Sequence, residues 1–182
     1  MGYGLWHVII FEKDISITYI MDILYNNKPI YYNDVLTPSQ TSTLPSVKIN
    51  DLGYNFYTLI MYDPDAIDGT YWHWISANID LENDATKNIG NIILDYEGPN
   101  PPDSKIHHYV FELYGTNHKI DVAKFVSRNV SLGEGKKMLN IENNPILFTR
   151  FLSEKAKRKT GGRSKSKKTK NRKRKITRKK NA

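Results

Sequence analysis

The chain has 182 residues, no cysteine and a formal net charge of +8. The absence of cysteine excludes disulfide bonds and thiol chemistry. No apolar stretch reaches the roughly 18 residues that a membrane-spanning helix requires, so no membrane span is predicted.

The charge is divided unevenly between two parts of the chain. Residues 155–182 contain 16 of the 27 Lys and Arg residues and no Asp or Glu. Residues 1–154 contain the other 11 basic residues against all 19 acidic ones, a net charge of −8. The first part is long enough to bury roughly 70% of its unfolded surface, whereas the second is too polar to offset the entropy of ordering. We therefore expect residues 1–154 to fold as one domain and residues 155–182 to form a basic, disordered tail.

Short apolar runs separated by turn-forming segments recur along the first part. The turn-rich segments include residues 26–29 and 37–45. This spacing is typical of antiparallel strands in a β-sandwich. Strands are expected at residues 5–11, 15–24, 57–62, 73–80, 92–96 and 107–114.

Two helices are expected near the end of the predicted domain. One covers about residues 121–129, and the other begins at Asn144, an N-cap residue that is followed by proline. The second has an approximate apolar stripe, formed by Ile146, Phe148, Phe151 and Leu152. Residues 132–137, LGEGKK, lack the full spacing of a phosphate-binding loop and are predicted to form a turn.

Two segments concentrate the polar chemistry of the chain. They are YDPDAIDGTYWHW at residues 62–74 and GPNPPDSKIHHYVFELY at residues 98–114. Each places carboxylates, imidazoles and Gly/Pro turns beside an apolar run, a composition that suits a pocket. Strand alternation predicts that His73 shares a face with Ile75, while Trp72 and Trp74 lie on the other face. The same rule places four residues of the second segment on one face: His107, Tyr109, Phe111 and Leu113.

These two segments resemble the signature of the phosphatidylethanolamine-binding protein family, which includes the Raf kinase inhibitor protein, plant flowering-time regulators and bacterial and archaeal homologues. The resemblance rests on the DPDA turn, the aromatic-His-Trp strand, and the Gly-x-x-Pro-Pro loop that leads into His-x-Tyr-Val-Phe. It implies a mainly β fold, an antiparallel β-sandwich with Greek-key connections and short C-terminal helices.

The resemblance also implies a non-catalytic binding module with no cofactor. The implied ligand is a phosphate or phosphoryl headgroup, carried by a phosphatidylethanolamine-type lipid or a phosphorylated partner, and a protein partner such as a kinase is also implied. A protonated imidazole donates two N–H groups to such a ligand, and a nearby carboxylate favours that charged form. Binding should then weaken as the pH rises through the histidine pKa. The residues carried over to this pocket are Asp63, Asp65, His73, Gly98, Pro102, His107 and Tyr109.

The sequence departs from the family pattern at three places. Ile67 stands where the family has proline, and Ser104-Lys105 replaces a glycine-rich turn. His108 stands where the family has arginine, and we expect it to support the loop rather than to contact the ligand. Lys105 is expected to add a cation to the rim of the pocket.

The basic tail suggests a second class of function. Its charge fits nucleic-acid binding, nuclear targeting or attraction to an anionic surface, and it has no aromatic residue to stack on bases. The alternative is therefore a nucleic-acid-associated or virion-packaging protein that acts through residues 155–182. A second alternative is a metal-dependent hydrolase that holds zinc with the two histidines and an aspartate. The expected location is intracellular, cytoplasmic or nuclear, or within a virion if the source is a virus.

Overall fold

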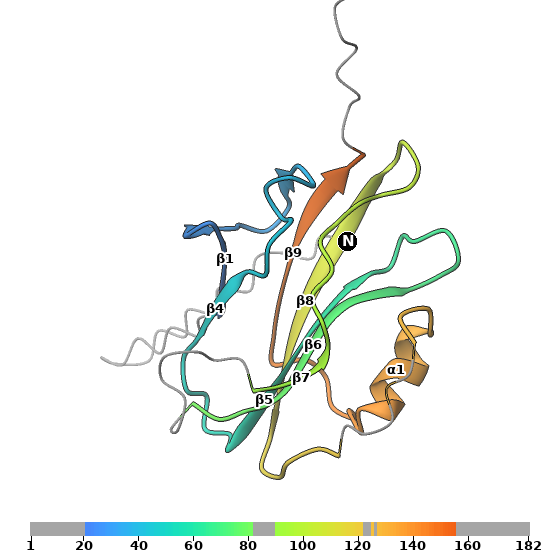
Figure 1. Ribbon diagram of the computed structural model, residues 1–182. Coiled ribbons are helices and arrows are strands. Elements are labelled where there is room, and N and C mark those ends of the chain that lie inside the picture. The colour runs from blue at the N-terminus through green and yellow to red at the C-terminus, as the bar shows by residue number, and fades with distance from the viewer. Residues whose placement is uncertain (1–20, 82–89, 122–124, 126, 156–182) are drawn as a thin grey trace, which may run out of the picture.

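A computed structural model describes residues 21–81, 90–121, 125 and 127–155. These residues form two β-sheets and one short helix (Figure 1). The predicted strand at residues 5–11 and the predicted tail from residue 156 onward lie outside the described residues. No helix in the described part of the chain is long and apolar enough to cross a membrane.

The smaller sheet has three strands in the order β2-β1-β4, and all of its pairs are antiparallel. Its strands are β1 (Met21–Tyr25), β2 (Lys28–Pro29) and β4 (Ser46–Ile49). The larger sheet has six strands in the order β3-β9-β8-β5-β6-β7. Its pairs are antiparallel except for β3 with β9. Its strands are β3 (Asp34–Leu36), β5 (Phe56–Asp63), β6 (Tyr71–Ile79), β7 (Asn91–Leu94), β8 (Ile106–Thr116) and β9 (Leu147–Glu154).

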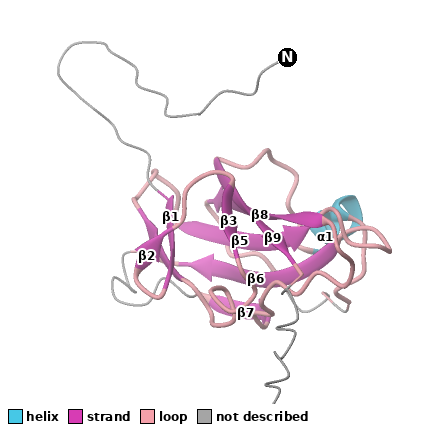
Figure 2. Cartoon of the chain, turned by 90° about the horizontal axis from the view of Figure 1, so that it is seen from above, coloured by secondary structure: helices cyan, strands magenta, loops and turns pink. Residues whose placement is uncertain are grey.

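The larger sheet is covered on both faces, and this explains why β5 is apolar along its whole length. On one face, Ile23 and Val47 of the smaller sheet pack with Leu59 and Phe111. On the other face, Leu139, which follows helix α1 (Leu132–Met138), packs in the cluster around Trp72. In Figure 2, α1 and the β1–β2 pair accordingly lie at opposite sides of the molecule. The predicted mainly β architecture of two packed sheets is confirmed.

The predicted helix that begins at Asn144 is wrong, because residues 147–154 form strand β9. The apolar residues of this segment do not alternate as in a half-buried strand, because Phe148 and Leu152 lie on one face of β9 and Phe151 on the other. Antiparallel pairing with β8 and the stacking of Phe151 on Tyr109, with 5.3 Å between ring centroids, select the strand. The first predicted helix, at residues 121–129, lies partly outside the described residues, and none of its described residues is helical.

The predicted turn at residues 132–137 is also wrong, because this segment forms helix α1. Ser131 and Glu134 form a capping box in which each side chain accepts a hydrogen bond from the other residue's backbone N–H, both at 3.3 Å. Gly135 is buried, and a Cβ atom at this position would collide with the ring of Trp72. The glycine therefore allows the helix to pack closely on the sheet, rather than marking a turn.

A β-bulge at His73 breaks the alternation that was predicted for β6. Met61 pairs with Trp74 and the next residue, Tyr62, pairs with Trp72, so β6 contains one extra residue at His73. As a result Trp72 and Trp74 lie in different core clusters. Ile75 joins the cluster of Trp72, whereas the His73 ring contacts Tyr109 on the other face of the sheet, with 5.1 Å between centroids. The prediction that His73 and Ile75 share one face of the strand is therefore wrong.

Candidate functional site

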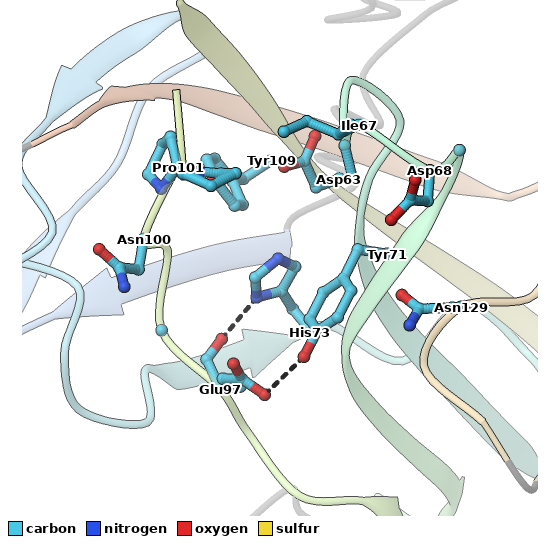
Figure 3. A pocket seen from close by; sticks show the side chains of 14 residues that line it. Asp63, Ile67, Asp68, Tyr71, His73, Glu97, Asn100, Pro101, Tyr109 and Asn129 are labelled. Carbon is cyan, nitrogen blue, oxygen red and sulfur yellow. Dashed lines mark hydrogen bonds between the residues drawn. The ribbon is translucent and has the colours of Figure 1, made fainter. Parts of the chain in front are cut away.

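A cavity of about 420 Å³ lies at the end of the larger sheet where β5 turns into β6 (Figure 3). Its wall combines the end of β5, the turn after it, the start of β6, the segment that follows β7, and β8. The residues that line it are Asp63, Ala66, Ile67, Asp68, Gly69, Tyr71, His73, Glu97, Gly98, Asn100, Pro101, Pro102, Tyr109 and Asn129.

Five of the seven residues carried over from the family resemblance line this cavity: Asp63, His73, Gly98, Pro102 and Tyr109. Gly98 is needed there because a Cβ atom would lie only 2.7 Å from the carbonyl oxygen of Thr41. Asp65 and His107 lie outside the lining. Whether any of these residues binds a ligand stays a prediction.

His73 is buried at the start of β6, and both its ring and its backbone bond to Glu97 in the segment that follows β7. Its Nδ1 lies 2.7 Å from the carbonyl oxygen of Glu97, and the Glu97 N–H donates in return to the His73 carbonyl at 2.9 Å. Since a carbonyl only accepts, Nδ1 carries the hydrogen, and in the neutral ring Nε2 is an acceptor. Burial lowers the pKa of His73 below its usual 6.5, which outweighs the opposing effect of this hydrogen bond. Asp63 and Glu97 do favour the charged imidazole, as expected, but burial outweighs their effect at His73.

His107 is also buried, with 1% of its surface exposed, but its ring bonds to carboxylates on both sides. Nδ1 lies 2.7 Å from Asp63 Oδ2, and Nε2 lies 3.1 Å from Asp103 Oδ1. Burial disfavours the charged ring, but the hydrogen bonds to Asp63 and Asp103 and their charges outweigh it and raise the pKa of His107. Both ring nitrogens are thus occupied by protein groups. The two imidazoles do not meet in the cavity as expected, and His107 acts on it only through Asp63.

Asp63 and Asp65 organise the turn between β5 and β6. Asp63 Oδ1 accepts from the Asp65 N–H at 2.8 Å. Asp65 Oδ2 accepts from the His108 N–H at 2.8 Å and lies 2.6 Å from the His108 ring nitrogen Nδ1. His108 therefore connects the start of β8 to this turn. Lys105, which was expected at the rim, does not line the cavity.

The opposite wall is held by a network that the sequence did not suggest. The Tyr71 hydroxyl donates to Glu97 Oε2 at 2.9 Å, and Arg128 Nε lies 3.3 Å from the same oxygen. Arg128 also donates to the carbonyls of Trp72 at 2.8 Å and Asp95 at 2.7 Å. The guanidinium thereby fixes the segment after β7 against the start of β6. Arg128 and its neighbour Asn129 lie outside both motif segments, and no local sequence signal identifies them.

The charges of the lining differ from those expected of an electropositive pocket. Three lining residues are acidic, namely Asp63, Asp68 and Glu97, and none is Lys or Arg. His107 bonds to Asp63 and Arg128 bonds to Glu97, but neither His107 nor Arg128 lines the cavity. Burial, followed by the charge of Asp63 and the hydrogen bond to it, raises the pKa of the Tyr109 hydroxyl, so this group stays protonated and donates to Asp63. The cavity therefore presents hydrogen-bond acceptors and negative charge together with a few neutral donors.

Within the described ranges, no group of three His, Asp or Glu side chains is placed to hold a metal ion. The zinc site that the hydrolase alternative requires would have to combine His73 and His107. In the structure these rings bond to different partners, Glu97 and the pair Asp63 and Asp103.

The fold is thus a β-rich domain in which two sheets pack together and a small polar cavity lies at one end. The chain belongs to the phosphatidylethanolamine-binding protein family, because the family model "Phosphatidylethanolamine-binding protein" matches residues 26–155. The resemblance inferred from the two motif segments is thereby confirmed.

Individual relatives match a smaller part of the chain. It is 37% identical over 102 residues to Protein TERMINAL FLOWER 1 of Arabidopsis thaliana, a match that covers 52% of this chain and 55% of the relative. It is 35% identical over 113 residues to Protein MOTHER of FT and TFL1 homolog 2 of Oryza sativa subsp. japonica, covering 59% and 61%. The chain therefore spans little more than half the length of these relatives.

Among solved structures, the chain is similar to a protein from Chlamydia trachomatis described as a homologue of phosphatidylethanolamine-binding protein. The TM-score is 0.48 and the sequence identity 17%, and the match covers 77% of this chain and 99% of that protein.

Proposed function

We propose that this protein is a non-catalytic binding module that takes a phosphoryl headgroup into the cavity beside His73. The observation that carries the proposal is the cavity itself, which motif residues of the phosphatidylethanolamine-binding family line at the end of the larger sheet. Its volume of about 420 Å³ suits a small headgroup.

The charges of the lining favour a zwitterionic headgroup over a simple anion. A bare phosphate would face Asp63, Asp68 and Glu97 without a lysine or arginine in the lining. A headgroup that carries an ammonium as well as a phosphoryl group, as phosphorylethanolamine does, can place its cation near these carboxylates. The donors for its phosphoryl oxygens are the His73 ring, when protonated, and the Tyr109 hydroxyl, which must exchange its hydrogen bond to Asp63 for one to the ligand.

A purely binding role also agrees with the residue types of the lining. Phosphoryl transfer to the protein needs an activated nucleophile, whereas burial raises the pKa of the lining Tyr109 hydroxyl and so keeps it unactivated. His107, which could act as a base, bonds to carboxylates through both ring nitrogens.

The test is a titration of the full chain with soluble phosphorylethanolamine, followed by NMR of the histidine ring signals. We expect saturable shifts at His73, and at least tenfold weaker binding in His73→Gln. His118→Gln is the matched control, because His118 is exposed and does not line the cavity. Equal affinity in the two variants, or no shift at His73 in the unaltered chain, would refute the proposal.

A further inference from the structure

One end of the larger sheet gathers three segments that are far apart in sequence. Tyr62, near the end of β5, pairs with Val110 of β8, and Ile106 at the start of β8 pairs with Glu154 at the end of β9. The turn after β5, the loop before β8 and the end of β9 therefore lie at the same end of the sheet (Figure 1). The cavity opens among the first two of these segments.

The basic tail starts at the rim of the cavity. Lys155, the last described residue, donates from Nζ to the carbonyl oxygen of Pro102 at 2.6 Å, and Pro102 lines the cavity. The 27 residues that follow Lys155 contain 15 Lys and Arg and no acidic residue. The strongly basic part of the sequence thus follows directly after a residue at the rim, whereas residues 1–154 carry a net charge of −8.

The same end of the molecule exposes two isoleucines. Ile67, in the turn after β5, lines the cavity and is 68% exposed, and Ile106, the first residue of β8, is 52% exposed. Neither side chain contributes to either core cluster. Aliphatic side chains around a polar cavity gain free energy when they enter the apolar part of a lipid interface.

We infer that the cavity rim, with Ile67, Ile106 and Lys155, forms a docking surface for an anionic phospholipid membrane. The tail is attracted to the surface charge, Ile67 and Ile106 enter the interface, and the cavity faces the headgroups. For the headgroup in the cavity this inference rests on the proposed function. The acidic body alone would be repelled by an anionic surface, and the tail reverses that repulsion.

A nucleic acid would use this surface less well. Contact with phosphates explains the basic tail but gives no role to isoleucines at the cavity rim. The tail also contains no aromatic residue that could stack on bases.

The experiment measures flotation of the full chain with phosphatidylcholine vesicles that contain phosphatidylserine, phosphatidylethanolamine, both or neither. We expect binding to require phosphatidylserine and to weaken with added salt. Ile67→Ser should weaken it by roughly tenfold. Ile92→Ser is the matched control, because Ile92 is 41% exposed on β7 and does not line the cavity. Replacing four tail residues by glutamine should weaken binding by roughly a hundredfold or more: Arg172, Lys173, Arg174 and Lys175.

Three results would overturn the docking surface: no binding to any vesicle, equal binding by Ile67→Ser and Ile92→Ser, or displacement from vesicles by a stoichiometric amount of duplex DNA or RNA. The titration with soluble phosphorylethanolamine measures headgroup binding in the cavity separately from membrane docking. If that titration fails while vesicle binding still depends on Ile67 and on the tail, the proposed function is refuted and the docking surface is supported.

Discussion

Replacing Asp63 by asparagine should destabilise the domain strongly, because the Asp63 carboxylate is the buried partner of His107. The side chains of Asp63 and His107 are 5% and 1% exposed, and Asp63 Oδ2 lies 2.7 Å from His107 Nδ1. Removing one member of a buried ion pair costs about 3–5 kcal/mol, because the other charge is left uncompensated. Asp63 Oδ1 also accepts from the Asp65 N–H, a bond that asparagine can keep. We therefore expect the free energy of unfolding to fall by about 3 kcal/mol.

The sign of the pH dependence follows from the raised pKa of His107. A histidine whose pKa is higher in the folded state contributes stability below its unfolded pKa of about 6.5, and this contribution is lost as the pH rises through the folded pKa. The difference in unfolding free energy between the unaltered chain and Asp63→Asn should therefore be larger at pH 5.5 than at pH 8.5. His73 has the opposite dependence, since its pKa is lowered, but its contribution largely cancels in this difference.

The assay is urea unfolding of both proteins at several pH values, with Asp68→Asn as the control. Asp68 lines the same cavity but is exposed, and its substitution should change stability by no more than about 0.5 kcal/mol. Equal losses in the two variants, or a difference between Asp63→Asn and the unaltered chain that does not vary with pH, would refute the reasoning.

Three further predictions concern the wall of the cavity and the helix. Sulfate keeps its charge in mild acid, so its affinity measured by calorimetry should rise as His73 becomes protonated, below pH 6.5, and a flat profile would exclude His73 as the donor. Gly135→Ala should destabilise by about 1–3 kcal/mol because its Cβ would collide with Trp72, whereas Gly133→Ala, which meets no atom within 4 Å, should not; equal effects in thermal unfolding would contradict this. Arg128→Met removes the hydrogen bonds to Trp72 and Asp95 and should speed hydrogen exchange of the segment after β7, so unchanged protection would count against its anchoring role.

The sequence predicted the central strands because their apolar runs are continuous. β5 and β8 lie in the middle of the larger sheet and are covered on both faces or alternate regularly, so their periodicity is unambiguous. The prediction of a helix at β9 failed because its apolar residues do not alternate, and only pairing with β8 selects the strand. The bulge at His73 is a property of how β6 pairs with β5, and no local pattern reveals it.

The sequence predicted those cavity residues that belong to motifs, but not those whose role depends on contacts made in the folded chain. Asp63, His73 and Tyr109 belong to recognisable motif segments, and they do line it. The role of His107 depends on Asp103, which lies four residues earlier and occupies the nitrogen that a ligand would need. Arg128 comes from a segment without any motif, and its hydrogen bonds to backbone carbonyls depend on the fold alone.

The bulge in β6 makes one position serve two requirements. Because the strand takes an extra residue there, the imidazole of His73 faces the cavity while the indole of Trp74 remains in the core on the same side of the sheet. Deleting a single residue at this point would restore regular pairing and force one of the two rings out of its place. The lining of the cavity and the packing of the core are therefore coupled at His73, and neither can be redesigned there without rebuilding the other.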